Sequence, residues 1–129
     1  MNPHSVLLID PDRDSRVIYS MLLDHSGYRV VVTSEMEEGV RVAREERPTL
    51  ILTELFVRTA HGWTILEALR GDEATAAIPI IALSAHALPD DRRRAWLADV
   101  FLSKPCGVND LLKEVERLCG TRYSVARSA

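Results

Sequence analysis

The sequence has little cysteine and no long apolar run, and each absence excludes a class of protein. Its two cysteines, Cys106 and Cys119, form neither a CxxC motif nor a zinc-ligand spacing, so we expect idle thiols in a reducing compartment. No apolar stretch approaches the ~20 residues of a transmembrane helix, and the N-terminus lacks the basic and apolar regions of a signal peptide. We therefore expect a cytoplasmic protein that makes no contact with a membrane.

A basic field is also absent, which makes nucleic acid an unexpected partner. The formal net charge is −3 and the pI is about 5.8. The one basic run, residues 92–94, follows two aspartates and is typical of a solvated helix face. The four histidines are scattered and predict no metal site. A chain of 129 residues, 47% of them hydrophobic, suits a single domain with a real core.

What the sequence does contain is an alternation of two periods. Short apolar runs, typical of strands buried on both faces, alternate with segments whose apolar residues recur at helical spacing. The first predicted helix pairs Val17 with Met21 and Ile18 with Leu22 at i, i+4, and it ends at Gly27. The predicted strands, each followed by a helix, are residues 6–9, 30–32, 50–52, 80–83 and 100–102.

The other helices are predicted from caps and apolar stripes. Ser34 and Glu37 form a capping-box pattern that predicts the start of the second helix. Gly39 within that helix costs ~1 kcal/mol relative to alanine, so tertiary contacts must offset it. The fourth helix is expected at about 89–97. We expect one domain over residues 1–120, followed by a short, polar, loose tail over 121–129.

Five strand–helix pairs predict an α/β fold with a parallel sheet covered on both faces by helices. In such sheets, ligands bind beyond the carboxyl ends of the strands. Polar residues stand at four of these five ends, and they are Asp10 and Asp12, Glu54, Ser84 and Lys104. Acids, a hydroxyl and a lysine on one edge predict a functional or formerly functional pocket.

The order and spacing of five motifs resemble the receiver domain of two-component response regulators. The resemblance covers residues 6 to about 118. It implies a flavodoxin-like (βα)5 fold with strand order 2-1-3-4-5 and a role in phosphorelay signalling. The motifs are LLIDPD, PTLILTEL, a loop ending in HGW, ALSAHA and FLSKP.

The resemblance also implies roles for single residues. In the family, an aspartate after the third strand accepts a phosphoryl group, two acids after the first strand help to hold Mg²⁺, and a lysine binds the phosphoryl oxygens. By resemblance, Lys104 is that lysine, and its bond to Pro105 is expected to be cis. Ser84 is the hydroxyl that moves toward the phosphoryl group, and Phe101 is the aromatic residue that changes rotamer.

Two departures from the family fall on the chemistry itself. Glu54 occupies the phospho-acceptor position, and Pro11, which offers no side-chain oxygen, occupies the position of a metal-binding acid. Asp10 and Glu54 remain from the metal site, and Asp12, one residue beyond the usual pair, could substitute. Because Mg²⁺ needs near-octahedral oxygen ligands, we expect no cofactor, with Mg²⁺ bound weakly or not at all. Leu97 stands where the family commonly has glycine and predicts a rebuilt or shortened turn before the fifth strand.

The longer side chain of Glu54 predicts an ion pair with Lys104. Its carboxylate reaches roughly an ångström beyond that of an aspartate. One hypothesis is that Glu54 is a standing, partial mimic of the phosphorylated state in a pseudo-receiver. The alternative is that the pair neutralises a relic pocket and favours no active state. Glutamate carries one negative charge and phosphoaspartate close to two, so mimicry would be incomplete.

The first candidate function is a signalling module without catalysis that binds a protein in trans, either a histidine kinase or an effector protein. The expectation rests on the absence of an effector domain after the fifth helix. The face of the fourth helix, fifth strand and fifth helix is expected to carry this contact or a homodimer. Its interface residues are Arg92, Arg93 and Trp96, unless Trp96 packs inward in place of the glycine turn.

Two other functions are open on the residues alone. One is a working receiver that accepts phosphate on Asp10 or Asp12. The other is a small phosphatase, because Asp10-Pro11-Asp12 matches the DxD opening of haloacid-dehalogenase-type enzymes, with Asp10 as nucleophile.

Overall fold

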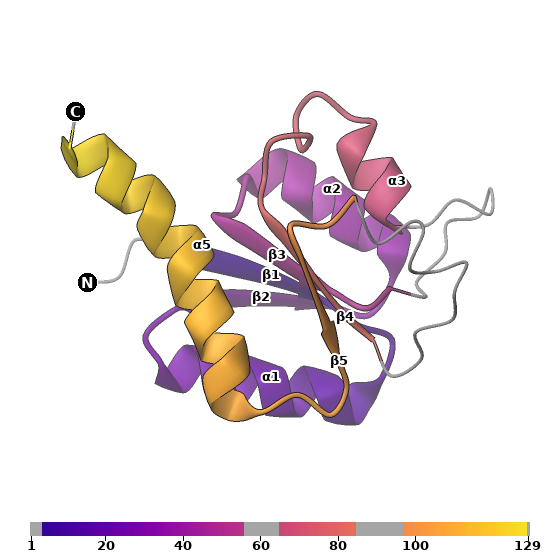
Figure 1. Cartoon of the computed structure of the whole chain (residues 1–129). Helices are drawn as coiled ribbons and strands as arrows, with labels where there is room; N and C mark the ends of the chain where they lie inside the picture. The colour runs from indigo at the N-terminus through magenta and orange to yellow at the C-terminus, as the bar shows by residue number, and fades with distance from the viewer. Residues whose placement is uncertain (1–3, 56–64, 85–96, 129) are drawn as a thin grey trace.

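Five parallel strands form one sheet in the order β2-β1-β3-β4-β5, as the flavodoxin-like fold requires (Figure 1). The computed structural model describes residues 4–55, 65–84 and 97–128, and for residues 121–128 it describes the backbone alone. The strands are β1 (Ser5–Ile9), β2 (Arg29–Thr33), β3 (Leu50–Thr53), β4 (Ile80–Ser84) and β5 (Val100–Ser103). The helices are α1 (Arg13–His25), α2 (Met36–Glu46), α3 (Ile65–Arg70) and α5 (Val108–Ser128).

The core consists of two clusters, one on each face of the sheet. Helices α1 and α5 cover one face of the sheet, and α2 and α3 cover the other (Figure 1). Alternate residues of β1 point to opposite faces: Val6 and Leu8 join the cluster under α1 and α5, while Leu7 and Ile9 join the cluster under α2 and α3. All four side chains are at most 1% exposed, which explains why β1 reads as a continuous apolar run. The sheet is therefore fixed from both sides, and its carboxyl edge is a rigid support.

Gly39 marks a close approach of α2 to β1. A Cβ atom at this position would lie 2.6 Å from Cδ1 of Ile9, closer than two carbon atoms can approach. The tertiary contact expected to offset the helical glycine is therefore the packing of α2 directly on Ile9.

The apolar pairs that predicted α1 are not the residues that bury it. Tyr19 and Leu23 are buried against the sheet, whereas Val17, Ile18 and Met21 are exposed. Helical spacing predicted the helix itself and its end, where Gly27 has φ 96°. Spacing could not indicate which face packs inward, because this helix is apolar on both sides.

Two predictions about helix ends are wrong. The capping box of Ser34 and Glu37 is absent: α2 begins at Met36 after Glu35, and no side chain caps it. Met36 is buried in the core, and the helix begins one residue later than the box requires. The segment expected to be a loose tail instead continues α5 to Ser128, because residues 121–128 contain no proline or glycine to end a helix. A domain boundary at residue 120 stays a prediction.

The turn before β5 is held by Arg70, at the end of α3. Its Nε donates to the carbonyl oxygen of Leu97 at 2.9 Å, and its Nη2 lies 2.9 Å from Oδ2 of Asp99. The same Asp99 oxygen accepts a hydrogen bond from the backbone nitrogen of Ile80 at 2.8 Å. One arginine thus fixes the turn in which Leu97 replaces the glycine.

Candidate functional site

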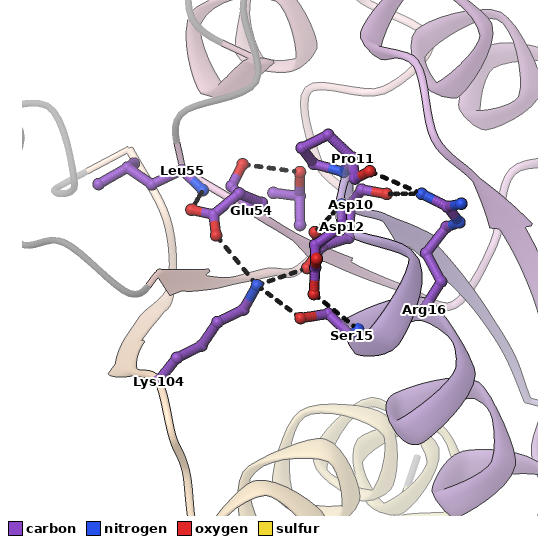
Figure 2. Close-up of polar contacts among 9 residues, drawn as sticks. Asp10, Pro11, Asp12, Ser15, Arg16, Glu54, Leu55 and Lys104 are labelled. Atoms are coloured by element: carbon purple, nitrogen blue, oxygen red, sulfur yellow. Dashed lines mark hydrogen bonds and ion pairs between the residues drawn. The ribbon is translucent and has the colours of Figure 1, made fainter.

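The carboxyl ends of β1, β3 and β5 bring the predicted acids and lysine together (Figure 2). Asp10 follows β1, Glu54 follows β3, and Lys104 follows β5. Ile9 is paired with Thr53 in the sheet register, so the two acids leave the sheet side by side. Topology alone therefore assembles a pocket from residues more than ninety positions apart.

Lys104 is the centre of this pocket. Its Nζ lies 2.7 Å from Oδ2 of Asp10, 3.0 Å from Oγ of Ser15 and 3.1 Å from Oε1 of Glu54 (Figure 2). An ammonium group has three N–H donors, so all three have acceptors. Burial alone would lower the pKa of Lys104, but the hydrogen bonds and charges of Asp10 and Glu54 outweigh it and raise the pKa above its ordinary value. The predicted ion pair between Glu54 and Lys104 is present.

The two buried acids are also held by backbone groups. Oδ1 of Asp10 accepts from the backbone nitrogen of Asp12 at 2.9 Å, and Oε2 of Glu54 accepts from that of Leu55 at 2.6 Å. Asp10 is 2% exposed and Glu54 is 8% exposed. Each carboxylate therefore has one oxygen on the backbone and one on Lys104, so both oxygens of each buried acid have a partner.

Asp12 has a different role from its neighbour. Its Oδ2 accepts from the backbone nitrogen of Ser15 at 2.9 Å, so this carboxylate is the N-cap of α1. The hydrogen bonds from Ser15 and the nearby Lys104 and Arg16 lower the pKa of the Asp12 carboxyl below its ordinary value. Asp12 is exposed and its carboxylate serves the helix end.

Sequence reasoning missed two contributors to the pocket, Ser15 and Arg16. Ser15 supplies an acceptor to Lys104, and Nη1 of Arg16 donates to the carbonyl oxygens of Asp10 and Pro11, each at 2.9 Å. Both residues lie in the first turn of α1, directly after the acid loop. The spacing of Ser15 three residues after Asp12, typical of a helix cap, was the available signal.

The residues do not fit the magnesium ion that the family fold implies. Pro11 contributes no side-chain oxygen, Asp12 caps a helix, and the ammonium of Lys104 already lies between the carboxylates of Asp10 and Glu54. Mg²⁺ requires near-octahedral oxygen ligands at short distances. Within the described residues, no group of three or more His, Cys, Asp or Glu side chains is arranged to hold a metal ion.

The remaining predicted site residues lie around this centre or outside the described ranges. Ser84 is fully buried at the end of β4, and Phe101 in β5 is half-buried against the cluster under α2 and α3. The peptide bond between Lys104 and Pro105 is cis. The predicted interface residues Arg92, Arg93 and Trp96 lie outside the described ranges, as does nearly all of the predicted fourth helix.

Sheet order, a pocket of acids and a lysine at the carboxyl edge, and the cis Lys104–Pro105 bond together define a receiver-type α/β domain. The response regulator receiver domain family matches residues 6–116. The chain therefore belongs to this family of two-component signalling domains. Within the described residues, none of the helices has the length and apolar character needed to span a bilayer.

Similar proteins include both short and longer response regulators. The polar-differentiation response regulator DivK of Brucella anthropi is 28% identical over 120 residues, which are 92% of this chain and 98% of DivK. The DNA-binding dual master transcriptional regulator RpaA of Synechocystis is 32% identical over 115 residues, which are 88% of this chain and only 48% of RpaA. The family thus occurs alone and as part of longer proteins.

One solved structure offers a chemical contrast. The receiver domain of the sensor histidine kinase PA1611 from Pseudomonas aeruginosa is 26% identical, with a TM-score of 0.82 over 92% of this chain and 99% of that one. That structure has a magnesium ion coordinated in its active site cleft. The fold is shared, and in this chain Pro11 stands in the acid loop while Lys104 lies between the carboxylates of Asp10 and Glu54.

Proposed function

We propose that this chain is a receiver-like signalling module of the cytoplasm that is not phosphorylated at Glu54 and acts by binding a protein partner in trans. The partner is a histidine kinase or an effector protein. The observation that carries the proposal is the ammonium of Lys104, which lies 2.7 Å from Asp10 and 3.1 Å from Glu54. The charge of both acids is therefore partly offset by an ammonium from within the chain, and Glu54 occupies the lysine that would bind phosphoryl oxygens.

Phosphoryl transfer depends on positioning and on neutralising charge, and this pocket lacks the means for both. Pro11 removes one metal-binding acid, and Glu54 extends its carboxylate onto the lysine that would otherwise bind phosphoryl oxygens. We therefore also propose that Mg²⁺ binds weakly or not at all, and that the module has no catalytic activity. The module signals through the binding of a protein partner to its surface.

The test is the intact mass of the protein after incubation with acetyl phosphate and Mg²⁺. We expect no gain of a phosphoryl group. The double variant Pro11→Asp/Glu54→Asp restores both family acids and is the positive control. A gain in the unmodified chain that disappears in Glu54→Gln would overturn the proposal.

Phosphorylation at another acid is the alternative that the same experiment addresses. A mass gain that persists in Glu54→Gln and maps to Asp10 or Asp12 would establish a working receiver with an unusual acceptor. Both oxygens of Asp10 are engaged, which argues against it. For the phosphatase hypothesis, the measurement is Mg²⁺-dependent turnover of p-nitrophenyl phosphate, with Asp10→Asn as control.

The mimic and relic hypotheses share the Glu54–Lys104 ion pair and separate on partner binding. If Glu54 imitates a phosphorylated residue, Glu54→Gln weakens binding to the partner, because the ion pair between Glu54 and Lys104 is lost. If the pocket is a relic, the same variant leaves the affinity unchanged. Isothermal titration calorimetry of a purified partner kinase or effector, once with the unmodified chain and once with Glu54→Gln, distinguishes the two hypotheses.

A further inference from the structure

Helix α1 presents an apolar stripe to solvent. Val17, Ile18 and Met21 are 47%, 60% and 66% exposed, and they are three of the five large hydrophobic residues exposed among the described residues. Val17 and Met21 lie one turn apart on the side opposite the buried Tyr19 and Leu23. Single exposed apolar residues are common, but a contiguous group on one helix face indicates a contact surface.

Four exposed side chains flank Val17 and Met21 in two pairs. Arg13 and Asp24 are eleven residues apart, close to three helical turns, and so lie together on one side of these two apolar residues. Asp14 and His25 have the same separation and lie on the other side, between Met21 and Ile18 around the helix. The members of each pair are about 16 Å apart along the axis, too far to meet within one helix. Among the described residues, none of the four side chains takes part in an ion pair.

Two of these charges are placed against the preference of the helix itself. Arg13 is in the first turn, where the helix dipole favours anions, and Asp24 is in the last turn, where it favours cations. Neither has a partner within the described part of the chain that would offset the unfavourable position. A partner outside the chain would account for both.

The pattern is self-complementary. Both charge pairs are centred within half a residue of position 19, which is also the midpoint of Val17 and Met21. A two-fold axis through that point, perpendicular to α1, maps each end of the helix onto the other end in a second copy. Such an isologous contact requires this symmetry, because residue i meets j and j meets i.

We propose that the exposed face of α1 is a self-association surface, on which α1 of a second copy packs antiparallel. The two apolar stripes form the centre of the contact. Arg13 of each copy faces Asp24 of the other, and Asp14 faces His25, so four polar contacts surround the apolar centre. The surface is distinct from the face of the fourth helix, β5 and α5, and the proposal does not depend on the chemistry of the pocket.

The first test is sedimentation velocity of the full chain over a range of concentrations. We expect a monomer–dimer equilibrium in the unmodified chain and at least a tenfold higher dissociation constant in Met21→Lys, which places two cations at the centre of the contact. Arg41→Asp on α2, on the opposite face of the sheet, is the control and should dimerise normally. A chain that is monomeric throughout, or a Met21→Lys variant that dimerises normally, overturns the proposal.

The second test exchanges the charges. Arg13→Asp and Asp24→Arg each create like-charge pairs in a homodimer, so each variant alone is expected to be monomeric. Mixed in equal amounts, the two variants restore opposite charges at both contacts and are expected to form a heterodimer. Both changes agree with the helix dipole, so the variants should fold, which circular dichroism checks. A mixture that stays monomeric contradicts the antiparallel geometry.

Discussion

At Lys104, one ammonium group contacts two buried carboxylates and a hydroxyl, so each of its three N–H groups has an acceptor. A buried ion pair is not in itself a strong stabiliser, since desolvation of the charges offsets much of their attraction. Its removal is a different matter. Without the ammonium, Asp10 and Glu54 would face each other as like charges in a poorly solvated site.

We predict that Lys104→Met lowers the free energy of unfolding by about 3 kcal/mol, as breaking a buried ion pair does. Urea unfolding at pH 7 is the measurement. Lys113 is the other lysine of the chain and is exposed, so Lys113→Met is a matched control with little expected effect. Adding Glu54→Gln to Lys104→Met removes one of the two unpaired charges and should recover part of the loss. Equal free energies of unfolding of Lys104→Met and Lys113→Met would show that the contacts of Lys104 do not stabilise the fold.

Thr33 is a residue whose polar atom has no role in the fold. It is 3% exposed, and its Oγ1 is the one buried side-chain oxygen without a hydrogen-bond partner among the described residues. Thr33→Val replaces the hydroxyl with a methyl group of similar shape and should raise the free energy of unfolding by about 1 kcal/mol. Thr33→Ser keeps the hydroxyl but loses the methyl group, and it should be less stable than the unmodified chain. Thermal unfolding of the three proteins provides the comparison.

At this scale, the sequence predicted chemistry better than geometry. The pairing of Glu54 with Lys104 followed from two strand ends and one extra methylene group. The role of Asp12 did not, because a carboxylate at this position can cap a helix or face the pocket, and the choice depends on the path of the loop. The role of Arg16 could not be predicted either, because its side chain donates to backbone carbonyl oxygens and no pattern of side chains indicates such contacts.

At the scale of elements, α2 contains a residue of low helix propensity, Gly39, because its close packing on β1 leaves no room for a side chain. Gly39→Ala should lower the free energy of unfolding by roughly 1–3 kcal/mol, because the new Cβ would lie 2.6 Å from Cδ1 and 2.9 Å from Cγ1 of the buried Ile9, whose side chain would have to repack. The gain in helix propensity of ~1 kcal/mol offsets only part of this loss. Gly120 in α5 has open space around it, so Gly120→Ala should instead stabilise. If urea unfolding shows that Gly39→Ala stabilises the chain as Gly120→Ala does, the close contact of α2 with β1 is wrong.

Strands were predicted more accurately than helix boundaries, for a physical reason. A strand buried on both faces needs an unbroken apolar run, and β1, β3 and β4 have one. A helix end depends on weak local preferences that tertiary contacts override, as with Met36 at the start of α2. The interior face of α1 was undetermined because both of its sides are apolar.

At the scale of the whole molecule, stability should depend on pH in the alkaline range. Burial raises the pKa values of Tyr19, Tyr28 and Cys106, and the contacts with Asp10 and Glu54 raise that of Lys104 despite its burial. A group with a raised pKa in the folded state contributes stability below its ordinary pKa, which is 9.0 for cysteine, 10.0 for tyrosine and 10.5 for lysine. That stability is lost as the pH rises through the raised value.

The expected outcome is a free energy of unfolding that is steady up to about pH 9 and declines above it. Urea unfolding at intervals between pH 8 and 11 measures the decline. Lys104→Met removes one titrating group and should decline less steeply, although it starts lower. A steep decline already at pH 8 would contradict the assignment to these four groups.

The three bonds of Lys104 join the ends of β1 and β3 to the first turn of α1, all through the segment that follows β5. Segments that rearrange during signalling usually open readily on their own, whereas this region opens only if several links break together. Its amide protons should therefore exchange with deuterium as slowly as those in the middle of β1. We therefore expect the region around Lys104 to keep one conformation, so that differences in signalling come from the proteins that bind the chain.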